Sequence, residues 1–319
     1  MGQAGLNHTG AVRPLGSDTH LIDTRMSGYD GITSAYAILA DRPCLVETGT
    51  ATSAATVVAA LANLGVGPDD LEYLVVTHIH LDHAGGVGDL AAAFPRATVV
   101  VQESGARHLA DPERLMNSAR RVFGSVLDDV FGPLSATDAQ RIRTIDESGE
   151  IDLGSGRALQ AFHSPGHASH HLGLLDSATG DLFVGDAAGI HVPETGELLP
   201  GTPPPEFDLD QAIASLRLFR EREPQRLLFS HFGPVIEPAD TLLRAEEEIQ
   251  VWVDAVRDAR SADLDLDHAV EMVRSKVAQR APRMRADPEV LEKFQHLNAD
   301  RTNVVGIGRW LDAQSDDSH

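Results

Sequence analysis

The chain has 319 residues, which is enough for one large domain or for a domain with an appendage. Its 26 basic and 48 acidic residues give a formal net charge of −22, which disfavours non-specific binding to nucleic acid. The sequence shows no signal-peptide pattern at its N-terminus and no apolar run long enough to span a bilayer. The single cysteine, Cys44, cannot form an internal disulfide and is expected to be a buried, inert thiol. We therefore expect a cytoplasmic protein.

The N-terminal part of the chain alternates short apolar runs with turn residues. Residues 1–16 are rich in glycine and small polar residues and predict a loose terminus. An amphipathic helix is expected over residues 51–64. Apolar, β-branched runs predict strands over residues 19–23, 34–39, 43–47 and 71–76.

Directly after the last of these strands, the segment 77–86 places three imidazoles and one carboxylate within six residues. Side chains of an extended segment alternate, so His78 and His80 can point the same way. Asp82 and His83 fall where the chain bends into small residues. Nitrogen and oxygen donors of this kind suit zinc and other divalent metals. A lone His-x-His on a surface is common, so this pattern needs further donors before it predicts a metal centre.

Three further donors follow, and each stands at or near the end of an apolar run. They are His167, Asp186 and His231. Donors carried on strand ends from distant parts of a chain are what a two-metal cleft at the edge of a sheet requires. Asp186 could instead be a structural carboxylate of the core. The complete set nevertheless predicts a dinuclear metal centre.

The residues between 104 and 145 form an expected helical insertion. Its apolar residues recur at three- and four-residue steps, at Met116, Ala119, Phe123, Val126, Leu127, Val130 and Phe131. This stripe can pack on the main core, or it can form a lid or the contact of a homodimer. Arg120 and Arg121 are expected to face solvent.

The second half of the chain predicts strands followed by helices. The glycine- and proline-rich stretch 187–205 predicts a long loop, in which His191 is expected to be exposed, with access to the cleft as the alternative. Strands are expected over residues 97–102, 159–162, 172–176 and 182–184. Helices are expected over residues 208–221, 239–260 and 265–280. We expect the tail 301–312 to fold back and residues 313–319 to be disordered.

The sequence resembles the metallo-β-lactamase superfamily over roughly residues 17–236. The His-x-His-x-Asp-His motif and the later ligands of that family match His78, His80, Asp82, His83, His167, Asp186 and His231. The resemblance implies a four-layer αββα sandwich over residues 17–238, with the helical insertion, and a C-terminal helical extension over 239–312 packed on it. It also implies how two metals are held: one by His78, His80 and His167, the other by Asp82, His83 and His231, with Asp186 bridging.

The resemblance has one departure and suggests supporting residues. Glu47 stands where the family usually has Asp, and its longer carboxylate can support the same ligand loop. Metal-ligating imidazoles need partners that fix their tautomers. Candidates for this role are Glu47, Thr77, Ser169 and His171.

The donor set favours hydrolysis. Two divalent metals lower the pKa of a bridging water, and the resulting hydroxide can attack a carbonyl or phosphoryl group. The Gly-x-Ser-x-Gly pattern of serine hydrolases is missing from the sequence. We expect a dinuclear zinc hydrolase of a small ester, lactone or thioester, with catalytic roles for Asp82 and Asp186. Iron or manganese are alternative metals, and no nucleic-acid or membrane partner is expected.

Other chemistries of the resembled family remain as alternatives. Residues 165–171 resemble the third motif of glyoxalase II, where Gly commonly stands in place of His170, but basic residues for glutathione are not recognisable. A phosphodiesterase or nuclease is possible from the ligands, although the acidic charge argues against it. A mononuclear iron persulfide dioxygenase would use two His and one Asp. Flavin-linked di-iron members carry Glu in place of His80 and a flavodoxin domain, and both features are missing here.

Overall fold

The computed structural model describes residues 11–295 and 299–316, which form two compact units. The first unit comprises the described residues up to Val101, together with Gly105–Thr144 and Asp152–Arg157. The second comprises Gln102–Ser104, Ile145–Ile151 and the described residues from Ala158 onwards.

The first unit is built on a sheet whose strands follow chain order. Within the described residues its seven strands are β1 (Val12–Gly16), β2 (Thr19–Asp23), β3 (Ser34–Ile38), β4 (Cys44–Val46), β5 (Tyr73–Val75), β6 (Thr98–Gln102) and β7 (Ile142–Ile145). Strands β1 to β4 are antiparallel neighbours, whereas β4, β5 and β6 run parallel. Strands β3, β4 and β5 are buried along their whole length, which explains their continuous apolar runs.

Short helices complete the first unit. They are η1 (Met26–Gly28), η2 (Ala51–Ser53), α1 (Ala54–Asn63), α2 (Leu81–Ala84), α3 (Val87–Ala93), α4 (Glu103–Ala110), α5 (Glu113–Phe123), α6 (Val126–Val130) and η3 (Ala139–Arg141). Thr50 caps the start of η2, which continues directly into α1. Its hydroxyl oxygen accepts the backbone N–H of Ser53 at 3.1 Å. Helices α1 and α3 contact one another.

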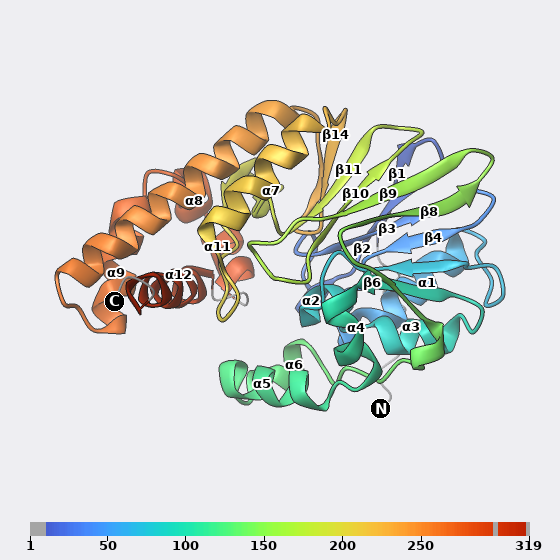
Figure 1. Cartoon of the computed structure of the whole chain (residues 1–319), viewed down its shortest axis with the longest axis horizontal. Helices are drawn as coiled ribbons and strands as arrows, with labels where there is room; N and C mark the ends of the chain where they lie inside the picture. The colour runs from blue at the N-terminus through green and yellow to red at the C-terminus, as the bar shows by residue number, and fades with distance from the viewer. Residues whose placement is uncertain (1–10, 296–298, 317–319) are drawn as a thin grey trace, which may run out of the picture. The chain divides into compact units, whose positions relative to one another are not determined.

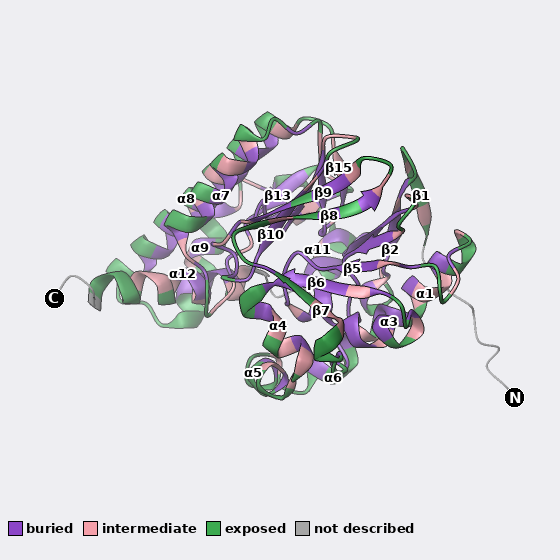
Figure 2. Ribbon diagram, turned by 45° about the vertical axis from the view of Figure 1, so that its right-hand side comes forward, coloured by how far each residue is buried: buried purple, intermediate pink, exposed green. Residues whose placement is uncertain are grey.

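The helical prediction for the insertion is confirmed over α4, α5 and α6, but it is wrong at the end, where residues 142–145 form β7. The apolar stripe is buried except for Phe123, which is half-buried, and Val126, which is 50% exposed. The Phe123 ring packs on Phe131 with 4.7 Å between centroids. Arg120 and Arg121 are exposed, as predicted. Much of α5 is correspondingly exposed in Figure 2.

The second unit combines a six-stranded sheet with long helices. Its strand order is β15 (Gly233–Val235), β14 (Arg226–Phe229), β11 (Asp181–Gly185), β10 (Leu172–Asp176), β9 (Arg157–His163) and β8 (Ser148–Gly154). Strands β11 and β14 are parallel, and β9, β10 and β11 are antiparallel neighbours. A separate hairpin joins β12 (Ile190–Val192) to β13 (Glu197–Leu199).

The helices of the second unit are α7 (Leu209–Glu221), α8 (Pro238–Ser261), α9 (Leu266–Val277), α10 (Pro282–Ala286), α11 (Pro288–Gln295) and α12 (Ala299–Asp316). The side chain of Asp208 caps α7 by accepting the N–H of Gln211 at 2.9 Å. Helices α8, α9 and α12 contact one another (Figure 1). The buried face of α8 includes Trp252, and its opposite face is exposed (Figure 2).

Several predictions for loops and termini need correction. Residues 12–16 form β1 and are not a loose terminus. The stretch 187–205 is not a simple loop, because it contains the β12–β13 hairpin. Residues 313–316 are helical, whereas 1–10 and 317–319 lie outside the described residues. Among the described residues, no helix has the length and apolar character needed to cross a bilayer.

The side chain of Arg141 caps the C-terminal end of α3. The guanidinium of Arg141 donates to the carbonyl oxygens of Ala91 (2.6 Å), Phe94 (2.8 Å) and Ala97 (2.6 Å). Cations favour helix C-termini, where carbonyl groups lack partners within the helix.

We expect Arg141→Ala to lower the free energy of unfolding by about 1–3 kcal/mol, because it leaves these carbonyls without a charged donor. Arg141→Lys should recover only part of the loss, since one ammonium cannot reproduce the planar fork. Denaturant titration measures both changes. Arg96→Ala, at an exposed arginine of the same unit, is the control. Equal stabilities of the Arg141→Ala and Arg96→Ala proteins would contradict the capping role.

Candidate metal centre

The first group of donors lies between β5 and α2 of the first unit. His78 and His80 follow the strand, and Asp82 and His83 lie on α2. The ring centroid of His78 is 4.6 Å from that of His80 and 4.2 Å from that of His83. Nε2 of His83 is 3.5 Å from Oδ2 of Asp82. His78 and His83 are buried, whereas His80 and Asp82 are partly exposed. The four residues of the motif are therefore gathered in one place within this unit.

Glu47 determines which nitrogen of His78 can bind a metal. Its Oε1 accepts the backbone N–H of Thr77 at 3.2 Å and the Thr77 hydroxyl at 2.5 Å. The Thr77 hydroxyl oxygen is 3.0 Å from Nδ1 of His78. Because the Thr77 hydroxyl donates its hydrogen to Glu47, its oxygen is left to accept Nδ1–H of His78. Nε2 of His78 then carries the lone pair that a metal requires.

The same carboxylate and its neighbour hold His83. Oε2 of Glu47 is 3.6 Å from Nδ1 of His83. The backbone N–H and the hydroxyl of Thr48 both donate to the carbonyl oxygen of His83, at 2.9 and 2.7 Å. Glu47 thus contacts both His83 and the segment that carries His78.

The second group of donors lies at strand ends of the second unit. His167 follows β9, Asp186 directly follows β11, and His231 follows β14. Oδ2 of Asp186 is 3.6 Å from Nε2 of His167 and 3.5 Å from Nε2 of His231. All three side chains are buried. The parallel pairing of β11 with β14 explains why Asp186 and His231 meet, because both strands end at the same edge of the sheet.

Backbone and side-chain partners orient this second group. Nδ1–H of His167 donates to the carbonyl oxygen of Gly201 at 3.0 Å, which leaves its Nε2 as the acceptor. His171 accepts the N–H of Asp186 through Nε2 at 3.2 Å, so its Nδ1–H donates to the Ser164 hydroxyl at 2.8 Å. His171 therefore supports the backbone of Asp186.

The structure places Ser169 and His191 differently from what the sequence predicts. Ser169 was a candidate support, but its N–H and hydroxyl donate to Glu206, at 3.0 and 2.7 Å. His191 was expected to be exposed, but it is half-buried on β12, where its N–H donates to the carbonyl oxygen of His231. Its Nδ1–H donates to the carbonyl oxygen of Phe232 at 2.8 Å. Burial lowers the pKa of His191, so the ring is neutral at pH 7. The alternation of Ile190, His191 and Val192 was the available sequence signal for a strand.

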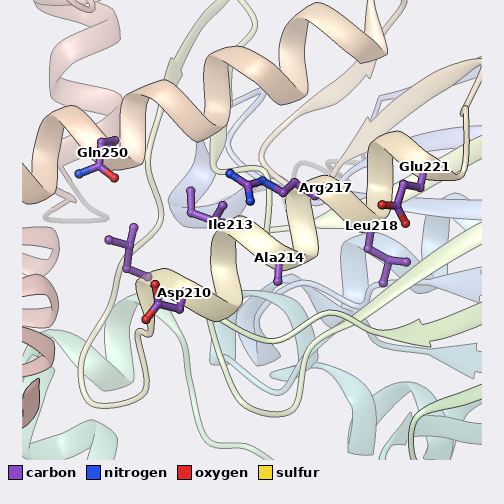
Figure 3. Close-up of a pocket in the computed structure, with 8 residues that line it drawn as sticks. Asp210, Ile213, Ala214, Arg217, Leu218, Glu221 and Gln250 are labelled. Carbon is purple, nitrogen blue, oxygen red and sulfur yellow. The ribbon is translucent and has the colours of Figure 1, made fainter.

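A hollow of about 530 Å³ lies elsewhere in the second unit, along α7 and beside Gln250 of α8 (Figure 3). Its lining mixes apolar side chains such as Ile213 with the charged groups of Asp210, Arg217 and Glu221. Arg217 donates to Glu246 at 2.8 Å, so its charge is already paired. Among the described residues, the side-chain groups that could hold a metal ion are drawn from the two donor groups and do not line this hollow.

The hydrogen-bond chain through Thr77 generates a testable prediction. Thr77→Val keeps the shape of the side chain but removes the hydroxyl that accepts Nδ1–H of His78. We expect divalent-metal affinity to fall by roughly 10–100-fold, as is usual when the partner of a ligating imidazole is lost. Thr77→Ser should restore it. Chelator competition measures the affinity, and nitrogen NMR of labelled histidines reports the tautomer. An unchanged tautomer and affinity in Thr77→Val would contradict the assignment.

The chain is similar to several known proteins. The N-acyl homoserine lactonase AttM of Azorhizobium caulinodans is 27% identical over 177 residues, which are 54% of this chain and 63% of that protein. The metallo-beta-lactamase fold-containing protein ST1585 of Sulfurisphaera tokodaii is 31% identical over 193 residues, 58% of this chain and 71% of that protein. The crystal structure of ST1585 matches with a TM-score of 0.64 at 27% identity, over 74% of this chain and 87% of that one.

A second solved structure matches most of the chain. The metallo-beta-lactamase family protein TTHA1429 of Thermus thermophilus has a TM-score of 0.66 over 95% of each chain, at 19% identity, which speaks for the fold alone. The predicted αββα class is thereby confirmed. The family model described as "Metallo-beta-lactamase superfamily" matches residues 28–231, a range that contains both ligand groups. The chain belongs to the metallo-beta-lactamase superfamily.

Proposed function

We propose that the chain is a dinuclear, zinc-dependent hydrolase of a small ester, lactone or thioester. The observation that carries this proposal is the way the imidazoles are oriented. Nδ1 of His78 and Nδ1 of His167 are each committed to a protein oxygen, so that Nε2 is the ligand atom in both. Neutral imidazoles and carboxylates are the donors that zinc takes in catalytic sites, so the residues present fit the metal.

The proposed ligand sets follow the family pattern. One metal would be held by His78, His80 and His167, and the other by Asp82, His83 and His231, with Asp186 between them. Bound divalent metals would supply Lewis-acid polarisation of the substrate and a more acidic water. Asp82, whose side chain is 15% exposed, and Asp186 are the residues to which we assign catalytic roles.

The choice of hydrolysis rests on the donor set and on the relatives. The presence of His80 favours a hydrolytic site over a di-iron site, in which the corresponding residue is expected to be Glu. The diflavin flavoprotein A 1 of Synechocystis is also similar, at 29% identity over 184 residues, but these residues are only 28% of that protein. The relative AttM is a lactonase, which supports a small acyl substrate. The formal charge of −22 disfavours a nucleic-acid substrate.

The metal content is the first test. Elemental analysis of protein purified without added metal should find about two metals per chain, mostly zinc. Parallel assays with ester, lactone, thioester and phosphodiester substrates should show turnover in one of the first three classes. One tightly held iron per chain together with persulfide-dependent oxygen uptake would instead assign the chain to a dioxygenase.

The second test separates Asp186 from an ordinary buried carboxylate. Asp186→Ala should reduce activity by more than the roughly 10–100-fold loss that is typical of residues which only support a ligand. It should also weaken metal binding while circular dichroism stays close to that of the wild type.

Asp181 offers a matched control on the same strand. It is buried at the beginning of β11 and paired with Arg226, with 2.8 Å between its Oδ1 and Nε of the arginine. Asp181→Ala should therefore lower stability but leave metal content and kcat/KM nearly unchanged. Full metal occupancy and unchanged kinetics in Asp186→Ala would rule out its role as a ligand.

A further inference from the structure

The backbone that orients His167 is a short segment, residues 200–202, which we call the strap. It follows β13 in the second unit. Its central residue, Gly201, accepts Nδ1–H of His167 through its carbonyl oxygen at 3.0 Å. A Cβ atom at Gly201 would lie only 3.1 Å from Nδ1 of His167. The imidazole therefore packs directly against the backbone of the strap, and a displacement of the strap would displace the ring.

Asn303 on α12 holds the strap on both sides of Gly201. Its Nδ2 donates to the carbonyl oxygen of Pro200 at 2.8 Å. Its Oδ1 accepts the backbone N–H and the hydroxyl of Thr202, each at 2.9 Å. Asn303 is 3% exposed, and Thr202 is fully buried. Only an amide side chain offers a donor and an acceptor in this arrangement, and the carboxylate of Asp would lack the donor.

Gly306 brings α12 itself against the strap. A Cβ atom at this position would lie 1.9 Å from the carbonyl oxygen of Thr202 and 2.9 Å from the carbonyl carbon of Pro203. The backbone of the helix thus meets the backbone of the strap without an intervening side chain. The helix is anchored in turn, because Val304 and Ile307 are buried in the core of the second unit. The core of the second unit therefore holds α12 in place, and Asn303 on α12 holds the strap.

We propose that Asn303 is a positioning residue for His167, acting through the strap to set the tautomer and direction of that imidazole. The inference rests on the proposed function in one respect, namely that His167 binds a metal. Asn303 lies outside the residues 28–231 that match the family model, so the family motif does not include it. A ligand whose ring is held by fixed hydrogen bonds binds metal more tightly than one that must be ordered first.

The test compares four variants of the full chain. In Asn303→Ala the strap loses the three hydrogen bonds to the side chain of residue 303, and in Asn303→Asp it loses only the donor to Pro200. Val304→Ala removes buried apolar atoms from the adjacent position of α12 and serves as the matched control for stability. His167→Ala removes the ligand itself. Chelator competition on the zinc-loaded proteins measures metal affinity, and the absorption of cobalt-substituted protein reports the ligand geometry.

We expect Asn303→Ala to weaken, by roughly 10–100-fold, the binding of the metal that His167 is proposed to hold, and to alter the cobalt spectrum. Asn303→Asp should show a smaller loss, because it keeps the acceptor for Thr202. Val304→Ala should lower the melting temperature without changing metal affinity or spectrum. If Asn303→Ala does not fold, the comparison of Asn303→Asp with Val304→Ala carries the test.

The remaining outcomes separate the inference from the proposed function. Weaker metal binding in His167→Ala, with unchanged binding in the folded Asn303 variants, would overturn the positioning role and leave the proposed function standing. Equal losses of affinity in the Asn303 variants and Val304→Ala would also overturn it, because the effect would then be one of general stability. Unchanged metal binding in His167→Ala would overturn both proposals, since His167 would not be a ligand.

Discussion

The structure of both ligand groups depends on one constraint: buried imidazoles and carboxylates must have hydrogen-bond partners that leave their ligand atoms available. Burying such groups without partners costs several kcal/mol, on the order of the stability of a domain. Here Glu47 and Thr77 satisfy His78, the carbonyl of Gly201 satisfies His167, and His171 supports Asp186. The hydrogen-bond partners must therefore lie at defined positions, as the metal donors themselves must.

Much of the candidate site could be predicted from the sequence, because its signals are local. The donors at 78–83 stand directly after a strand, and Asp186 and His231 close or follow apolar runs that became β11 and β14. Thr77 was a candidate supporting residue because it precedes His78, and Glu47 was one because of its place in the resembled family's first motif; the structure puts both in contact with this segment. The hairpin β12–β13 was missed, because its local signal, the alternation of Ile190, His191 and Val192, is short and lies within a stretch rich in glycine and proline, which predicts turns.

Other features depend on contacts between residues that are distant in sequence. The guanidinium of Arg141 donates to three carbonyl oxygens about 50 residues earlier, directly before β7 begins, and no local pattern predicts these partners. Asn303 contacts a strap roughly 100 residues earlier, and no local pattern distinguishes it from any other polar residue on a helix. Sequence periodicity describes which face of a helix is buried, but it does not name the partner of a buried polar group.

The direct contact between α12 and the strap has a consequence for how the boundaries of this protein are drawn. The family model ends at residue 231, the last of the seven proposed ligands. A chain cut at that point would contain every donor and still lack the groups that hold the carbonyl of Gly201 in place. The segment that matches the family model is therefore shorter than the segment that includes the contacts of the strap, which extends to Asn303. Family membership, which rests on residues 28–231, therefore does not account for the hydrogen bonds that α12 makes to the strap.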